Sequence, residues 1–175
     1  ALRINWSRGS GGRGLQPPAQ AKGRCWGSLH PHQPSFQRQQ VVISERVQRW
    51  ADDPLKGCKT LDYSAMVLAR LEASQAGASD VLLRSSQGGL CCGSSANLLV
   101  QEGGQWLTPP LSSGALPGVM RARGVAMGLI QEARLADSLP NEQPALLLHS
   151  LDCRPLNHIA EPLAEPLFVQ LLGSD

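Results

Sequence analysis

Apolar and polar residues alternate in several segments of the chain with the two-residue period of strands. Over Leu2–Ser7 the alternate apolar positions predict a strand with two unlike faces. Short apolar or β-branched runs between turn residues predict further strands, at 25–29, 41–44, 80–84, 90–100, 105–108 and 145–148. Glycine-rich turns at 85–89 and 102–104 are expected to join neighbouring strands into hairpins.

Residues 60–76 carry apolar side chains at helical spacing instead. The stripe of Leu61, Ala65, Leu68 and Ala69 is widened by further alanines and a methionine, which predicts a largely buried helix. Thr60 or Asp62 is expected to cap the start of this helix, and Gly77 follows its end.

Two more helices are predicted towards the C-terminus. One spans 119–134, and its stripe consists of Val119, Arg123, Ala126, Ile130 and Ala133. The other spans 162–172, where Pro166 is early enough in the helix to be tolerated. Strands in hairpins mixed with helices predict an α+β fold rather than a doubly wound one.

The composition is that of one ordinary soluble domain and excludes several classes of protein. The 175 residues are 42% hydrophobic and have a formal net charge of only +2, with scattered basic residues, which argues against a nucleic-acid binder. No apolar run approaches the roughly 18 residues of a membrane span. The chain starts without a methionine or a signal-peptide pattern, so we expect a fragment of a cytoplasmic protein.

The cysteines give no sign of a disulfide framework or a metal site. Their number is odd, at positions 25, 58, 91, 92 and 153, and this favours a reducing compartment. Because no two of them have Cys-x-x-Cys spacing, no metal is expected. We expect these thiols to pack as small hydrophobic groups.

Two glycine-rich segments are candidates for binding. Residues 9–14 lack the lysine of a phosphate-binding P-loop, which favours a turn or an active-site loop. Residues 112–120 instead turn tightly into the predicted helix at Gly118. Free backbone N–H groups at a helix N-terminus form a site for an anion, although many helices without a ligand also begin with proline and glycine.

Lys59 stands just before the first predicted helix and is one of only three lysines in the chain, with Lys22 and Lys56. A lysine in this place is either a surface residue or a buried amine kept for chemistry. A desolvated lysine has a lowered pKa and forms a Schiff base with a carbonyl compound.

Three motifs together resemble the class IV (fold type IV) pyridoxal-phosphate-dependent enzymes. Lys59-Thr-Leu-Asp-Tyr63 resembles their lysine-bearing segment, and Gly93-Ser-Ser-Ala-Asn97-Leu looks like their hairpin. The segment from Thr108 to Arg121, with Ser-Ser-Gly-Ala-Leu-Pro-Gly at its centre, is similar to their phosphate loop. The family includes branched-chain and D-amino-acid aminotransferases and 4-amino-4-deoxychorismate lyase, and this chain resembles the lyase most.

The resemblance implies a fold and a domain organisation. The fold would be the large C-terminal domain of the D-amino-acid aminotransferase-like proteins, with mixed sheets in a pseudo-barrel and packed helices. Residues 1–175 would be this cofactor-binding domain, with 1–24 near the domain junction, and the family's N-terminal small domain would be missing. A homodimer acting on a small molecule is also implied.

The resemblance assigns roles residue by residue. Lys59 would form the Schiff base with pyridoxal 5′-phosphate and move protons at the substrate, and Tyr63 would face the cofactor's phenolic oxygen. The cofactor phosphate would be held at Gly118 by the backbone N–H groups of Val119 and Met120. Ser150 would supply a hydroxyl to the same phosphate. Asn97 would stabilise the hairpin and take no part in the reaction.

Cys92 departs from the family pattern, which has a glutamate five residues before the hairpin asparagine. A neutral thiol offers no negative charge that would keep the pyridine nitrogen protonated. Transamination should suffer most from this change, whereas elimination of pyruvate from aminodeoxychorismate makes an aromatic ring and needs less help. We therefore expect a lyase that makes 4-aminobenzoate for folate synthesis. A class IV aminotransferase and a non-catalytic member of the family remain the alternatives.

Overall fold

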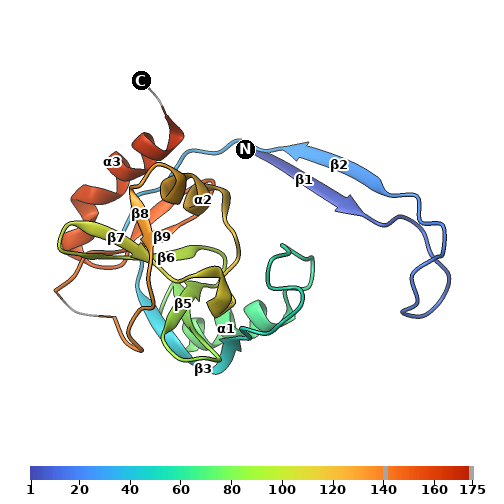
Figure 1. The fold of residues 1–175 in the computed structure, drawn as a ribbon, viewed down its shortest axis with the longest axis horizontal. Coiled ribbons are helices and arrows are strands. Elements are labelled where there is room, and N and C mark those ends of the chain that lie inside the picture. The colour runs from blue at the N-terminus through green and yellow to red at the C-terminus, as the bar shows by residue number, and fades with distance from the viewer. Residues whose placement is uncertain (140–141, 174–175) are drawn as a thin grey trace. The chain divides into compact units, whose positions relative to one another are not determined.

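The computed structural model describes residues 1–139 and 142–173, and the chain divides into two compact units, Ala1–Gln33 and Pro34–Asp175 (Figure 1). The first unit is an antiparallel hairpin of β1 (Leu2–Ser7) and β2 (Arg24–Leu29), joined by the glycine-rich segment. The predicted first strand is confirmed, and the second begins one residue earlier than predicted.

Within the described part of the second unit, eight strands form one mixed sheet in the order β10-β9-β6-β5-β4-β3, with β7 and β8 attached through β6. Their bounds are β3 (Val41–Arg49), β4 (Asp80–Ser85), β5 (Leu90–Gly93), β6 (Asn97–Glu102), β7 (Gln105–Thr108), β8 (Ile130–Glu132), β9 (Ala145–Leu148) and β10 (Cys153–Pro155). The β3–β4 and β7–β8 pairs are parallel, and the others are antiparallel. The strand β6 pairs with three neighbours, and the whole arrangement is α+β, as predicted.

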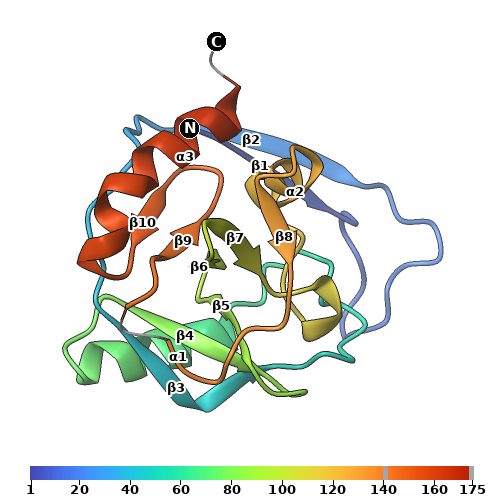
Figure 2. The same ribbon diagram turned by 60° about the vertical axis from the view of Figure 1, so that its left-hand side comes forward.

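The helices lie at opposite ends of the sheet. Helix α1 (Ser64–Gln75) packs beside β3 and β4, whereas α3 (Glu161–Leu172) lies along β10 (Figure 2). Helix α2 (Val119–Ala126) packs on β8 and α3. Each end has its own apolar core, one built around Phe168 and Leu146 and the other around Ala69 and Val81. The third helix is confirmed, since α3 continues through Pro166.

The first predicted helix is wrong in its start and in its burial. It begins at Ser64 rather than Thr60, after a turn in which the carboxylate of Asp62 accepts the Ser64 amide at 3.1 Å. Only Ala69 and Ala73 are buried, while Leu61 and Leu68 are about 60% exposed. A helix at the edge of a sheet buries one narrow face, and here the small alanines rather than the leucines occupy it.

The prediction of one helix over 119–134 is also wrong. Helix α2 ends at Ala126 because Gly128, at φ +72°, turns the chain back into β8. Ile130 is therefore a strand residue paired with Trp106 and does not continue a helical stripe. The predicted stripe itself fails at Val119, which is 71% exposed, because the buried positions of α2 are Met120, Arg121 and Gly124.

The predicted strand over 90–100 is interrupted as well. Residues Ser94, Ser95 and Ala96 form a turn between β5 and β6, closed by the bond from the Gly93 amide to the Ala96 carbonyl at 2.9 Å. This turn folds β6 back against β5, so that Cys92 and Asn97 become a cross-strand pair. No helix among the described residues is long and apolar enough to cross a membrane.

Gly124 is where α2 comes closest to its neighbours, and we expect Gly124→Ala to destabilise the fold. An added Cβ would collide with Cδ1 of Ile130 and lie 3.1 Å from Leu171. The gain in helix propensity is about 1 kcal/mol, so we expect a net loss of about 1–2 kcal/mol from overpacking. Denaturant unfolding measures it. Adding Ile130→Val, which removes the colliding methyl group, should restore part of the loss, and additive losses would contradict this explanation.

Candidate functional site

The segment between β7 and α2, residues 109–118, forms a loop that we call the clamped loop. It contains a short 3-10 turn, Leu111–Ser113, and Gly114 leaves that turn at φ +92°. Four side chains from four elements donate hydrogen bonds to its carbonyls. The bonds are Arg121 Nη2 to Pro109 O (2.8 Å), Cys91 Sγ to Ser113 O (3.4 Å), Arg49 Nε to Gly114 O (3.0 Å) and Asn97 Nδ2 to Leu116 O (2.9 Å). The loop is thus held by side chains of three sheet strands and of helix α2.

The end of the clamped loop is fitted closely to Asn97. A Cβ added at Gly118 would collide with Oδ1 of Asn97, so a larger residue fits here only if the Asn97 side chain moves. Gly118 is the N-cap of α2 and has an ordinary φ of −63°, which means that space rather than backbone conformation requires it. The hairpin residue and the loop residue of two predicted motifs therefore touch each other.

The first turn of α2 keeps backbone N–H groups available. The first hydrogen bond of the helix runs from the Ala122 amide to the Gly118 carbonyl, so the amides of Val119, Met120 and Arg121 precede it. Within the described residues no side chain caps this end. A helix N-terminus with uncapped amides attracts an anion through these donors and through the helix dipole.

Cys92 lies on the sheet beside this turn, since it pairs directly with Asn97. Its side chain is buried, and a hydrogen bond with Cys91, together with that burial, raises the pKa of the Cys92 thiol well above its usual value. The thiol is therefore neutral at physiological pH. As predicted for the cysteines, Cys91, Cys92 and Cys153 are buried, but Cys25 and Cys58 are exposed.

Lys59 and Tyr63 form a second group, on the segment that leads into α1. The Lys59 amine lies 5.9 Å from the centroid of the Tyr63 ring, within reach of a cation–π interaction. Both residues are accessible, Tyr63 at 40%. In contrast, the amine of the half-buried Lys56 donates to the carbonyl of the buried Ala51 and closes a turn. Of these two neighbouring lysines, Lys59 is the one whose amine faces no backbone acceptor among the described residues.

Ser150 lies in the turn after β9, two residues beyond Leu148, which pairs with Asn97. It is exposed, at the same end of the sheet as Asn97. The structure thus brings Cys92, Asn97 and Gly118 into contact or direct pairing. Ser150 stands near that group, and the Lys59–Tyr63 pair stands on its own segment.

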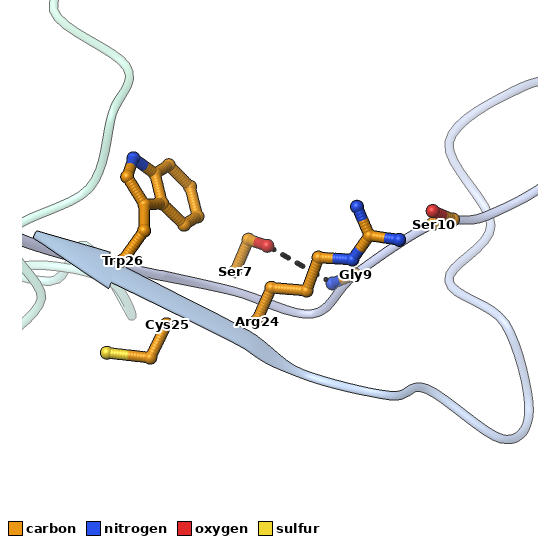
Figure 3. A pocket seen from close by; sticks show the side chains of 6 residues that line it. All are labelled: Ser7, Gly9, Ser10, Arg24, Cys25 and Trp26. Atoms are coloured by element: carbon orange, nitrogen blue, oxygen red, sulfur yellow. Dashed lines mark hydrogen bonds between the residues drawn. The ribbon is translucent and has the colours of Figure 1, made fainter.

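A separate hollow lies in the β1–β2 unit. It has a volume of about 590 Å³ and is lined by Ser7, Gly9, Ser10, Arg24, Cys25 and Trp26 (Figure 3). Its main internal bond is from the Gly9 amide to the Ser7 hydroxyl at 3.2 Å. None of the predicted site residues lines it.

Among the described residues no group of three or more His, Cys, Asp or Glu side chains is placed to hold a metal ion.

Sequence reasoning missed the donors of the clamped loop other than Asn97. Arg121 is part of a motif, but its 3% exposure and its bonds to Pro109 and Glu132 follow only from the turn into β8. Arg49 gave no signal, because it stands 65 residues before the carbonyl that it binds. For Cys91 the sequence predicts hydrophobic packing rather than a metal site, and its bond to the Ser113 carbonyl is not predicted.

Comparisons with known proteins agree with the predicted resemblance. The family model of class IV amino-transferases matches residues 1–159. The fold is similar to that of a Legionella pneumophila protein provisionally assigned as a 4-amino-4-deoxychorismate lyase, with a TM-score of 0.85 and 21% identity over 99% of this chain and 69% of that one. It is also similar to the Escherichia coli branched-chain amino acid aminotransferase, with a TM-score of 0.82 and 20% identity over 98% of this chain and 63% of that one.

One curated relative is similar to this chain over most of its length. It comes from Methanocaldococcus jannaschii, is provisionally assigned as a branched-chain-amino-acid aminotransferase, and is 28% identical over 152 residues. The match covers 86% of this chain and 51% of the relative. The chain therefore spans about half the length of this curated relative.

Proposed function

Since this chain belongs to the class IV aminotransferase family, whose enzymes depend on pyridoxal 5′-phosphate, we propose that it is the cofactor-binding part of a 4-amino-4-deoxychorismate lyase. The reaction would release pyruvate and leave 4-aminobenzoate. The observation that carries cofactor binding is the clamped loop, which delivers an uncapped helix N-terminus beside a glycine whose added Cβ would collide with Asn97.

The residues present fit the phosphate end of the cofactor. The amides of Val119 and Met120, with the Ser150 hydroxyl at the same end of the sheet, would hold the phosphate. When bound, the cofactor supplies an electron-accepting ring conjugated to the substrate nitrogen. Lys59 would attach the cofactor aldehyde and carry protons to and from the substrate, with Tyr63 beside it.

The ring end has an unusual partner in Cys92. Its thiol is buried and neutral, so it places no negative charge beside the cofactor ring. A cofactor ring with no negative charge beside it accepts electrons less well. Formation of an aromatic product, as in the lyase reaction, depends less on this electron acceptance than transamination does. This supports the lyase, and the similarity to the Legionella protein agrees with it.

A class IV aminotransferase is the second candidate. It is supported by the relative from Methanocaldococcus jannaschii and by the fold shared with the Escherichia coli enzyme. Under this proposal the substrate would be a branched-chain or D-amino acid. For either enzyme a homodimer in the cytoplasm stays a prediction, and sedimentation of the purified protein tests the dimer.

The two candidates predict different products from the wild-type protein. We expect 4-aminobenzoate from aminodeoxychorismate and little glutamate from an amino acid with 2-oxoglutarate. Glutamate without 4-aminobenzoate would reject the lyase, and neither product with no bound cofactor would reject both enzymes.

Replacing Cys92 tests the reason for proposing the lyase rather than the aminotransferase. We expect Cys92→Glu to raise glutamate formation about tenfold, because a carboxylate stabilises a protonated ring, and to leave lyase activity nearly unchanged. Cys92→Ser, which is also neutral and small, should change neither activity. An unchanged glutamate rate in a folded, cofactor-loaded Cys92→Glu protein would remove this argument for the lyase.

A further inference from the structure

The end of β3 contacts the clamped loop, and the chain that follows it leads to Lys59. We propose that Arg49 is a positioning residue that fixes the clamped loop for the cofactor phosphate. Arg49 thereby also sets the position of the loop relative to the chain segment that carries Lys59. This inference rests on the proposed cofactor site at the start of α2. It adds a residue that lies outside the three motifs.

The contact of Arg49 with the loop is direct and closely packed. Its Nε donates to the Gly114 carbonyl at 3.0 Å, and the guanidinium side chain is half-buried. A Cβ at Gly114 would lie 3.0 Å from the Trp50 carbonyl and 3.3 Å from Cβ of Arg49. The backbone at the end of β3 therefore touches the corner of the loop, and the bond fixes the angle at which they meet.

The neighbouring loop carbonyl is held from another strand. The Cys91 thiol donates to the Ser113 carbonyl at 3.4 Å, next to the carbonyl that Arg49 binds. A thiol is a weak donor, whereas a charged guanidinium forms one of the stronger hydrogen bonds in proteins. Arg49 is therefore the main restraint on this corner of the loop.

The chain beyond Arg49 leads through fixed turns to Lys59. The Asp53 amide donates to the Trp50 carbonyl at 3.3 Å, and the amide of the buried Ala51 donates to the Ser86 hydroxyl at 3.0 Å. Lys56 then binds the Ala51 carbonyl. None of these bonds involves the Arg49 side chain, so the path to Lys59 keeps its place when that side chain is lost, and the loop corner shifts relative to it.

We expect Arg49→Met to weaken the contribution of the phosphate to binding. Without the bond, the loop corner has an unsatisfied carbonyl and shifts against the start of α2. The affinity for pyridoxal 5′-phosphate should fall about tenfold, which corresponds to one lost charge-assisted hydrogen bond. The affinity for pyridoxal, the same aldehyde without the phosphate, should change less than about twofold.

The matched control is Arg46→Met, an exposed arginine on the same strand, which should bind both compounds as the wild-type protein does. Equilibrium titration of the wild-type protein and of both variants with each compound, followed by absorbance, gives the six affinities. If Arg49→Met does not fold, Arg49→Gln serves the same comparison.

The possible results separate this inference from the proposed function. A selective loss for the phosphate compound in Arg49→Met supports the inference. Equal losses for both compounds show general damage and overturn it, and so do unchanged affinities. If the wild-type protein does not prefer the phosphate compound to pyridoxal, the phosphate site itself is wrong, and the inference falls with it.

Discussion

Lys59→Ala is expected to abolish covalent attachment of pyridoxal 5′-phosphate and to lower the rate of the reaction at least about a thousandfold. The amine of Lys59 is the accessible one of the two neighbouring lysines, and it stands beside Tyr63. Without it the amine proposed to attach the cofactor aldehyde and to carry the proton is lost. Borohydride treatment followed by mass spectrometry should show the cofactor mass on the wild-type peptide and none on the variant.

The matched control is Lys56→Ala, three positions earlier in the chain. Because the Lys56 amine closes a turn on the Ala51 carbonyl, its loss should lower stability by about 1–3 kcal/mol but leave the attached mass on Lys59. Attachment that survives Lys59→Ala and disappears in a folded Lys56→Ala protein would assign the chemistry to the other lysine.

Gly118→Ala is expected to have the next largest effect. The added methyl group would collide with Oδ1 of Asn97 and push the start of α2 away from the sheet. We expect about 1–3 kcal/mol of lost stability from overpacking, and at least about a hundredfold loss of affinity for pyridoxal 5′-phosphate because the binding amides are displaced. Denaturant unfolding and cofactor titration measure the two effects separately.

Two further variants test the cause of this effect. Gly57→Ala places a methyl group where nothing lies within 4 Å, so it should leave both quantities nearly unchanged. Asn97→Ala removes the group that collides but also the bond to the Leu116 carbonyl. Adding Gly118→Ala to Asn97→Ala should therefore cost little more, whereas additive losses would show that the two residues act independently.

Strands with a clear local pattern were predictable, whereas the short strands β8 and β10 were not predicted. The strand Ala145–Leu148 is confirmed without change, because a short apolar run between turn residues has few alternatives. The helix over 60–76 was less predictable, since apolar spacing identifies a helix but does not show which face the sheet covers. The small residues Ala69 and Ala73 allow close approach to β3 and β4, and that selection depends on the tertiary structure.

The site residues likewise fall into those that the local sequence predicts and those that depend on the tertiary structure. Gly118 and the helix start at Val119 followed from the local sequence, because a tight turn into a helix is encoded by adjacent residues. Arg49 and Cys91 could not be found, because their roles arise from contacts with carbonyls 65 and 22 residues away. No local pattern encodes a contact between segments that far apart.

The four side-chain bonds to the clamped loop have an electrostatic consequence. All of them end on carbonyl oxygens, and the Pro110 and Leu111 carbonyls accept amides within the loop itself. The negative ends of these peptide dipoles are thereby occupied, while the N–H ends at the start of α2 are not. The potential in front of the helix is therefore positive before any ligand arrives, and an anion that enters meets a surface that needs no reorganisation.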